Sequence, residues 1–357
     1  MGYPKISINL DKLEENVKKI IDKLQRNNLN VMGITKAFAC EKEIVQLFKN
    51  NGINMVGDSR ILNLKKIENF DIEKVLIRIP MISSVEDVVK YSTISLNSEL
   101  KTIEALNEAG KKQNKIHGII LMVELGDLRE GFLPEELEEV ALKISKLDYI
   151  KIRGIGTNFS CIGGIIPDIN KINQLTQLTE TIEKKLNMKM EIVSGGNSSS
   201  YHLIGEVPLK RINNIRMGEG ILLGRETAFG ENIEGCHEDS FILQGEIVEI
   251  KNKKTVPYGK KGMDAFGKKP EFKDRGIRKR AILAIGKQDF DCDSLYPLDK
   301  GAEIIGASSD HLVVDISDSD KEYEIGDIME FQMGYGALLR GMTSIYIDKE
   351  FKKKKAK

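Results

Sequence analysis

The sequence contains no tryptophan, only four cysteines and no long apolar run. The cysteines are scattered without C-x-x-C spacing, which argues against a structural zinc site and favours a reducing cytosol; they are Cys40, Cys161, Cys236 and Cys292. No stretch of about 18 apolar residues occurs, and the N-terminal M-G-Y-P-K lacks the apolar core of a signal peptide. We therefore expect a cytoplasmic protein with no membrane partner.

The charges of the chain are evenly balanced. Lysine plus arginine equal aspartate plus glutamate at 54 residues each, which gives no electrostatic reason to bind nucleic acid. The final run F-K-K-K-K-A-K is basic, and such a run is more typical of a solvated chain end than of a nucleic-acid patch. The four histidines form no pair with metal-ligand spacing. We expect neither a nucleic-acid partner nor a metal site.

Short apolar segments alternate with amphipathic ones through the first two thirds of the chain. Helical spacing predicts helices over residues 10–24, 98–112 and 167–187. Strands that alternate with helices pair in parallel, and eight of them predict a closed (β/α)8 barrel of the TIM type. The eight predicted strands cover residues 29–35, 53–57, 75–80, 93–96, 118–124, 152–157, 190–194 and 212–216.

An open, doubly wound sheet is the alternative fold for this pattern. A glycine-rich dinucleotide turn after the first strand would favour it, and none is present. Beyond residue 230, six apolar segments, from F-I-L-Q-G-E-I-V-E-I to S-I-Y-I, follow one another with turns and no helical period. We predict a barrel over residues 1–229 and an all-β domain over 230–357, in which 252–280 form a long excursion.

Polar side chains follow several of the predicted barrel strands, at the end where such barrels carry their active sites. Each one alone has an ordinary structural interpretation, such as a surface arginine or an ion pair at the rim. Five groups at five strand ends are harder to explain in that way. They are Lys36, Arg129, Asn158, the pair Asn197 and Ser198, and Arg216.

Two small-residue turns follow the seventh and eighth predicted strands. The segment S-G-G-N-S-S-S-Y (194–201) combines glycines with hydroxyls where a helix begins, a pattern that binds phosphate through backbone N–H groups. A flexible turn with a helix cap is the alternative. M-G-E-G (217–220) can supply further N–H groups beside it, which is the usual phosphate position in these barrels.

With these motifs, the chain resembles the alanine-racemase family of fold-type III pyridoxal-phosphate (PLP) enzymes over nearly its whole length. G-I-T-K-A-F-A is similar to the family's PLP-lysine motif, which implies that Lys36 forms the Schiff base. V-E-L-G-D-L-R-E-G resembles the segment that binds the substrate carboxylate, with Arg129 as the arginine. The remaining motifs imply that the cofactor contacts are Asn158, Asn197, Ser198, Arg216, Gly218, Glu219 and Tyr335.

The resemblance also implies a mechanism and an assembly. T-V-P-Y-G-K-K-G resembles the family's catalytic tyrosine motif at Tyr258. Racemisation needs acid/base groups on both faces of the substrate, and Lys36 and Tyr258 would supply them. In this family the tyrosine comes from the partner subunit, so the resemblance implies a homodimer with shared active sites.

Departures from the family pattern concern the substrate. Cys40 replaces a tyrosine that contacts phosphate, and Met122 replaces a lysine. The pattern resembles the ornithine-racemase branch, whose cationic substrate needs an acidic or carbonyl partner. We expect substrate contacts from Ser309 and Asp310, and Asp264, Asp291 and Asp293 are further acidic candidates.

Three alternatives remain open at this point. D-C-D-S-L (291–295) resembles the substrate element of basic amino-acid decarboxylases of this fold, although those enzymes have an acidic residue where this chain has Arg216. An alanine racemase is the second alternative. The third is a small PLP-carrier barrel, a family that lacks a β-domain.

Overall fold

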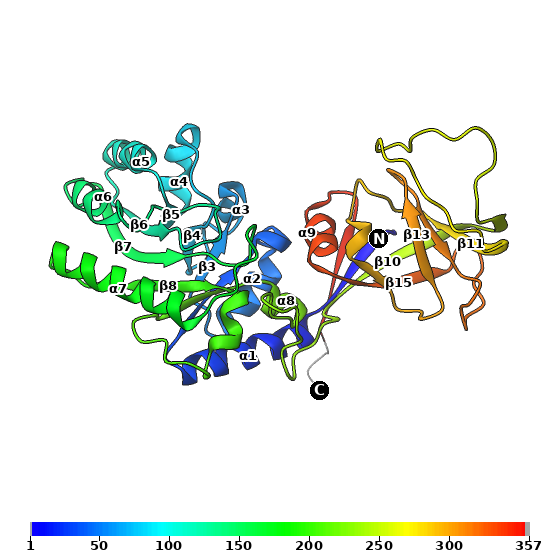
Figure 1. The fold of residues 1–357 in the computed structure, drawn as a ribbon, viewed down its shortest axis with the longest axis horizontal. Coiled ribbons are helices and arrows are strands. Elements are labelled where there is room, and N and C mark those ends of the chain that lie inside the picture. The colour runs from blue at the N-terminus through cyan, green and yellow to red at the C-terminus, as the bar shows by residue number, and fades with distance from the viewer. Residues whose placement is uncertain (1, 354–357) are drawn as a thin grey trace. The chain divides into compact units, whose positions relative to one another are not determined.

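The computed structural model describes residues 2–353, and the basic run from residue 354 onward lies outside the described part. The chain folds into two units (Figure 1): one spans Leu10–Glu238, and the other joins strand β1 (Lys5–Asn9) to the chain from Asp239 onward. This division differs from the predicted boundary at residues 229 and 230. The reason is that β1 pairs antiparallel with a strand that starts at Phe241 and parallel with one that starts at Asp348.

The unit Leu10–Glu238 is a closed barrel of eight parallel strands, as predicted. Each strand pairs with its neighbours in chain order, and the last strand pairs with the first. The strands are β2 (Asn30–Ile34), β3 (Met55–Asp58), β4 (Glu73–Leu76), β5 (Ile94–Asn97), β6 (His117–Val123), β7 (Ile150–Thr157), β8 (Ile192–Asn197) and β9 (Asn214–Met217).

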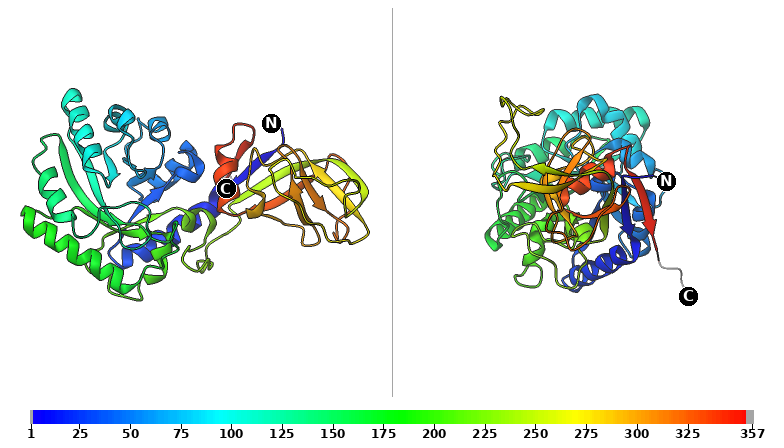
Figure 2. Two further views of the ribbon diagram at one scale, coloured as in Figure 1. Left: turned by 45° about the horizontal axis from the view of Figure 1, so that its top comes forward. Right: turned by 90° about the vertical axis from the view of Figure 1, so that its right-hand side faces the viewer.

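Helices follow the strands and surround the barrel (Figure 2). The first helix buries one face, formed by Leu13, Val17, Ile20 and Leu24, as its helical spacing predicts. The helices are α1 (Leu10–Arg26), α2 (Lys42–Asn50), α3 (Ile61–Lys66), α4 (Val85–Tyr91), α5 (Leu100–Gln113), α6 (Leu137–Ile144), α7 (Ile169–Leu186) and α8 (Glu219–Leu223), with short 3-10 turns η1 (Lys36–Phe38), η2 (Ile82–Ser84) and η3 (Ser198–Leu203).

Apolar side chains fill the barrel interior. The middle of the barrel is therefore a packed core and not a channel. Burial of each such side chain contributes roughly 1.5–3 kcal/mol to the stability of the fold. Polar chemistry is therefore confined to the two ends of the barrel. The core is formed by Met32, Ile34, Val75, Ile94, Leu96, Ile120, Met122 and Ile192.

The other unit is a mainly antiparallel sheet, which confirms the predicted β-domain, although it also contains a helix that the sequence pattern did not reveal. The strands are β10 (Phe241–Lys254), β11 (Ile277–Leu283), β12 (Leu295–Pro297), β13 (Glu303–Ala307), β14 (Leu312–Asp315), β15 (Ile328–Met333) and β16 (Asp348–Lys352). The helix is α9 (Tyr335–Thr343), and a 3-10 turn, η4 (Cys292–Ser294), precedes β12. The predicted strand S-I-Y-I is wrong by a few residues, because the chain bends there and pairs only from Asp348.

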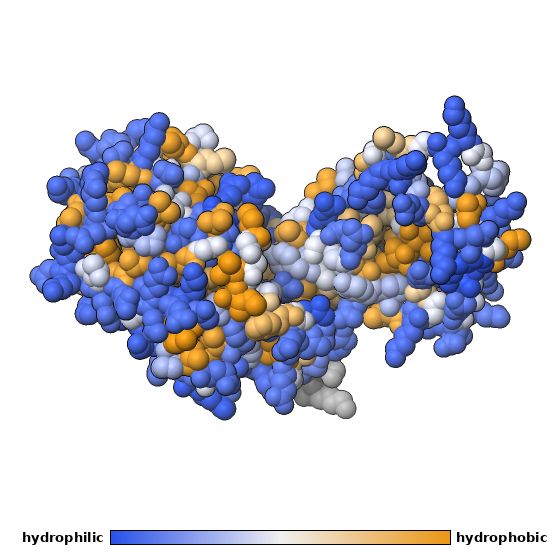
Figure 3. Space-filling model, viewed as in Figure 1, coloured by the Kyte–Doolittle hydropathy of each residue, from blue (hydrophilic) through white to orange (hydrophobic). Residues whose placement is uncertain are grey.

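Hydrophilic residues cover most of the face shown in Figure 3, with smaller apolar areas between them. None of the helices within residues 2–353 combines the length and the apolar character that a bilayer crossing requires.

Candidate active site at the carboxyl end of the barrel

Lys36 lies directly after β2, in a turn that is held to the neighbouring strand β3 by a hydrogen bond. The Thr35 hydroxyl is 2.7 Å from a carboxylate oxygen of Asp58 and donates to it, and Asp58 ends β3. Burial lowers the pKa of the Lys36 ammonium, and the positive charges of Arg129 and Arg216 lower it further. The fold therefore holds an amine that gives up its proton more readily than an exposed lysine.

Arg216 lies on β9 and is only 4% exposed. Its guanidinium donates to the Ser194 hydroxyl and to the Thr157 carbonyl, each at 2.7 Å, and to Asn158 Oδ1 at 3.2 Å. Burial lowers its pKa to about 10, against the opposing charge of Glu130. Arg216 thus stays cationic at neutral pH and is fixed by groups on β7, on β8 and just after β7.

The two predicted asparagines lie beside Arg216 and contact each other. Asn197 Nδ2 donates to Asn158 Oδ1 at 3.2 Å and to the Phe159 carbonyl at 2.8 Å. Asn158 Nδ2 in turn faces the Cys161 sulfur at 3.0 Å. The loop after β7 is therefore tied to the end of β8, and Cys161, which the sequence did not single out, lies in this network.

Ser198 is the centre of a cluster of N–H donors. The backbone N–H groups of Gly218 and Gly220 both point at its hydroxyl oxygen, at 3.3 and 3.2 Å. Gly218 was predicted as a cofactor contact and Gly220 was not, although Gly220 belongs to the M-G-E-G turn that was expected to supply N–H groups. Glu219 begins α8, and burial raises the pKa of its carboxyl. Converging N–H groups of this kind suit a small anion such as a phosphate group.

Arg129 lies on the loop between β6 and α6, and its nearest partner is the next residue. Its Nε and Nη2 both donate to the Glu130 carboxylate, in a two-pronged ion pair. The Glu124 carboxylate caps the start of the loop by accepting the N–H of Arg129 at 3.2 Å. Arg129 thus lies at the barrel mouth with its charge balanced by Glu130, a residue that the sequence pattern did not single out.

The loops after β6 and β7 are joined by one carboxylate. Asp127 is buried, and its oxygens accept the N–H groups of Cys161, at 3.1 and 3.3 Å, and of Ile162, at 3.3 Å. This contact fixes the segment that carries Arg129 relative to the segment that carries Asn158.

The two departures from the family pattern are both buried. Cys40 lies beneath the Lys36 turn with its sulfur 3.0 Å from the Thr35 hydroxyl, and burial raises the pKa of its thiol. Met122 points into the barrel core. Neither side chain offers a polar group at the surface of the mouth.

The other predicted site residues belong to the β unit. Tyr258 is 89% exposed in the excursion between β10 and β11, and Tyr335 is the first residue of α9 and half-buried. Ser309 and Asp310 form an exposed turn in which the Ser309 hydroxyl donates to the Asp310 carboxylate at 3.2 Å. The barrel unit brings together the rest of the predicted site.

The acidic candidates of the β unit differ in their surroundings. Asp264 accepts the N–H groups of its own turn, from Phe266 and Lys268. The D-C-D-S-L segment, in contrast, packs against the start of α9, where Ala337 N–H donates to the Ser294 hydroxyl at 2.7 Å. Asp291 therefore lies beside the start of α9, where a Cβ added to Gly336 would come within 2.5 Å of its carboxylate, and Asp293 belongs to the same segment.

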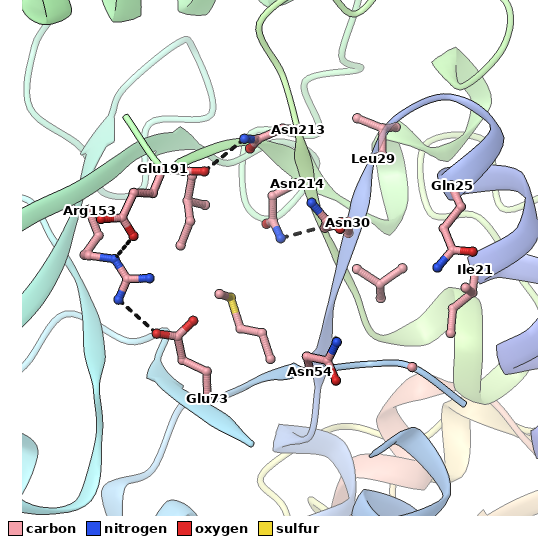
Figure 4. Close-up of a pocket in the computed structure, with 14 residues that line it drawn as sticks. Ile21, Gln25, Leu29, Asn30, Asn54, Glu73, Arg153, Glu191, Asn213 and Asn214 are labelled. Carbon is pink, nitrogen blue, oxygen red and sulfur yellow. Dashed lines mark hydrogen bonds and ion pairs between the residues drawn. The ribbon is translucent and has the colours of Figure 1, made fainter. Parts of the chain in front are cut away.

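The opposite, amino-terminal end of the barrel has a cavity of about 340 Å³ (Figure 4). Its charged groups are already paired with each other, because Arg153 bridges Glu73, at 2.9 Å, and Glu191. Asn213 donates to the Glu191 carbonyl at 2.9 Å. We therefore interpret this end of the barrel as structural, because barrels of this type carry their active sites at the carboxyl end and stabilising contacts at the amino end.

Comparison with known proteins defines the class. Residues 8–225 match the family model "Alanine racemase, N-terminal domain". The chain belongs to this family.

Two curated relatives cover almost the whole chain. An ornithine racemase of Acetoanaerobium sticklandii is 50% identical over 98% of this chain and 99% of its own length. A lysine racemase of Thermotoga maritima is 38% identical over the same shares of the two chains. Among solved structures, an alanine racemase of Bartonella henselae with covalently bound pyridoxal phosphate has a TM-score of 0.73 at 16% identity, covering 98% of this chain and 100% of its own. That likeness shows the fold.

Proposed function

We propose that this chain is a PLP-dependent amino-acid racemase that interconverts the enantiomers of a basic amino acid, in the first place ornithine. One observation carries the proposal: a lysine of lowered pKa, a buried arginine and a cluster of N–H donors meet at one barrel end, in a chain 50% identical to an ornithine racemase. The same end of related barrels holds the reaction.

The donor set fits this cofactor. Ser198, Gly218 and Gly220 would hold the phosphate, and a Cβ on Gly220 would lie 2.7 Å from the terminal methyl group of Met217, which would have to shift. Lys36 would hold the aldehyde carbon, and Arg216 and Asn158 would contact the pyridine ring. When bound, PLP supplies the electron-withdrawing group that weakens the bond between the substrate's α-carbon and its hydrogen.

Lys36 is the first proton-transfer group of the proposal. Its lowered pKa leaves a larger fraction of neutral amine at physiological pH, and a neutral amine can accept the α-hydrogen. Arg216 has a separate task. It remains protonated, and a cation in this position would disfavour protonation of the pyridine nitrogen of bound PLP, so the ring would be a weaker electron sink and side reactions such as transamination would be disfavoured.

Tyr258 is the second proton-transfer group, for the opposite face of the substrate. Its exposed position in the β unit suits a residue that serves another subunit. We therefore infer a homodimer in which each β unit completes the partner's site, together with Tyr335, Ser309 and Asp310. We place the enzyme in the cytoplasm, where its four free thiols stay reduced.

A chiral assay of the purified protein with ornithine, lysine, alanine and serine tests the proposal, with carbon dioxide release monitored in parallel. We expect rapid loss of optical rotation with ornithine and no carbon dioxide. Racemisation of alanine with ornithine inert would make it an alanine racemase. Carbon dioxide release would favour a basic amino-acid decarboxylase, against which the position of Arg216 argues.

A further inference from the structure

Glu130 is an acidic side chain at the mouth of the barrel that the proposed mechanism has not yet used. Its side chain is 15% exposed and that of its partner Arg129 is 34% exposed, so the ion pair is partly shielded from water. The charge of Glu130 is also felt by buried Arg216. Glu130 thus pairs with the arginine assigned to the substrate carboxylate and lies within electrostatic range of the arginine assigned to the cofactor.

The backbone around Glu130 leaves little freedom of placement. Gly131 has a φ of +147°, and a Cβ there would lie 2.2 Å from the Glu124 nitrogen. Phe132 then returns to the end of β6, where its N–H donates to the Met122 carbonyl at 2.8 Å. Because only glycine fits at 131, the chain can double back and hold Glu130 over the strand end.

Three other carboxylates around the mouth accept hydrogen bonds from fixed groups, while Glu219, at the start of α8, lies on the cofactor side beside Ser198 and carries a raised pKa that disfavours its charged form. Asp58 accepts from Thr35 and from the Arg60 N–H, and Asp127 accepts the N–H groups of the loop after β7. Glu124 likewise accepts backbone N–H groups of its own loop. Glu130 differs from them, because the partner shown for it is a flexible side chain that can turn to another anion.

We propose that Glu130 binds the side-chain ammonium of the substrate and so sets the preference for a basic amino acid. The inference rests on the proposed function and adds the residue that recognises the substrate's side chain. In the free enzyme Arg129 and Glu130 neutralise each other. When a basic amino acid binds, the ion pair between Arg129 and Glu130 is replaced by two. The α-carboxylate of the substrate pairs with Arg129, and its distal ammonium pairs with Glu130.

Charge balance explains why a neutral amino acid is disfavoured. Its carboxylate would draw Arg129 away and leave the Glu130 carboxylate shielded and unpaired, which is costly. A basic amino acid leaves no charge without a partner. The same pair therefore acts against neutral substrates and in favour of cationic ones.

Ornithine and norvaline provide the matched substrates for a test, because they differ only in the distal amine. We expect the holoenzyme to prefer ornithine, and Glu130→Gln to lower kcat/KM for ornithine by about 10- to 100-fold, the effect of one charge-assisted hydrogen bond. The value for norvaline should stay level or rise. Glu135→Gln, an exposed change in the same segment, should leave both values unchanged.

The outcomes separate the inference from the proposed function. If Glu130→Gln lowers kcat/KM equally for ornithine and for norvaline, Glu130 only positions Arg129. The inference then fails while the proposed function stands. If the unaltered holoenzyme racemises no basic amino acid, the proposed function itself fails. A circular dichroism spectrum and a cofactor absorbance equal to those of the parent protein would show that the variant is folded and loaded.

Discussion

Arg216 Nη2 donates a hydrogen bond of 3.2 Å to Asn158 Oδ1 across the mouth of the barrel. The same oxygen accepts from Asn197, so two donors fix the orientation of the Asn158 amide. Its Nδ2 then faces Cys161. A neutral amide held in this way offers a flat contact surface and adds no charge next to the arginine.

Lys36 is expected to carry the cofactor. Borohydride reduction followed by peptide mass spectrometry should place the cofactor mass on the peptide that contains Lys36. Lys36→Ala should abolish turnover, because no other group replaces its amine. The exposed Lys42→Ala should keep full activity. Turnover by Lys36→Ala with added PLP would contradict the assignment.

Tyr258 is expected to act on one face of the substrate and in the partner's site. Tyr258→Phe should block exchange of the α-hydrogen with solvent in one enantiomer far more than in the other. Mixing inactive Lys36→Ala and Tyr258→Phe proteins should restore part of the activity through hybrid dimers. An absence of complementation would mean that the tyrosine acts within its own chain or not at all.

Cys161 is expected to be the thiol whose alkylation inactivates the enzyme. It is exposed beside Asn158, whereas Cys40 is fully buried. Iodoacetamide should inactivate the parent protein, and bound ornithine should slow the loss. Cys161→Ser should resist the reagent. Equal inactivation of the variant would point to Cys236 or Cys292, which are half-buried.

Glu183 is expected to make stability depend on pH in the acid range. Its side chain is 3% exposed. Burial alone would raise its pKa, but Arg211, Lys189 and the Met190 N–H bring the pKa down to about 2. A depressed pKa stabilises the fold above the unfolded value near 4.5, and this contribution is lost as the pH falls towards about 2.

Urea unfolding of Glu183→Gln provides the measurement. At pH 7 the variant should be less stable by roughly 2 kcal/mol, because two cations and a buried N–H lose their charged partner. The difference should shrink as the pH falls from about 4.5 towards about 2, because the carboxyl group of the unfolded parent chain takes up a proton in this range while that of the folded protein resists it. Glu180→Gln, exposed one turn earlier on α7, should change little. A constant difference across this range would exclude the charge as the cause.

The barrel could be predicted from sequence because its signals are local. Each strand is a short apolar run, and each pairs with the next strand along the chain. Lys36 and the two small-residue turns could be placed for the same reason, since they directly follow strands. The predicted positions of Lys36, Ser198 and Arg216 needed only the rule that parallel strands end on one side.

The features that the sequence did not predict depend on contacts between residues far apart in the chain, or on contacts that form only after a loop has folded. Strand β1 is only Lys5–Asn9, and its partners begin at Phe241 and Asp348, so no local pattern shows where it belongs. Helix α9 is short and lies among strands. Glu130 follows Arg129 in an ordinary charged run, and its role emerges only when the loop folds back at Gly131.

The pairing of β1 with β16 has a consequence for how the protein is made. The first and last described strands are neighbours in one sheet, so the barrel is an insertion within the β unit. During synthesis the barrel can fold as soon as it leaves the ribosome, whereas β1 can pair only after β10 and β16, which follow the barrel in the chain, have been translated. Deletion of either β1 or β16 should therefore damage the same sheet, and an isolated barrel should be cut to begin at Leu10.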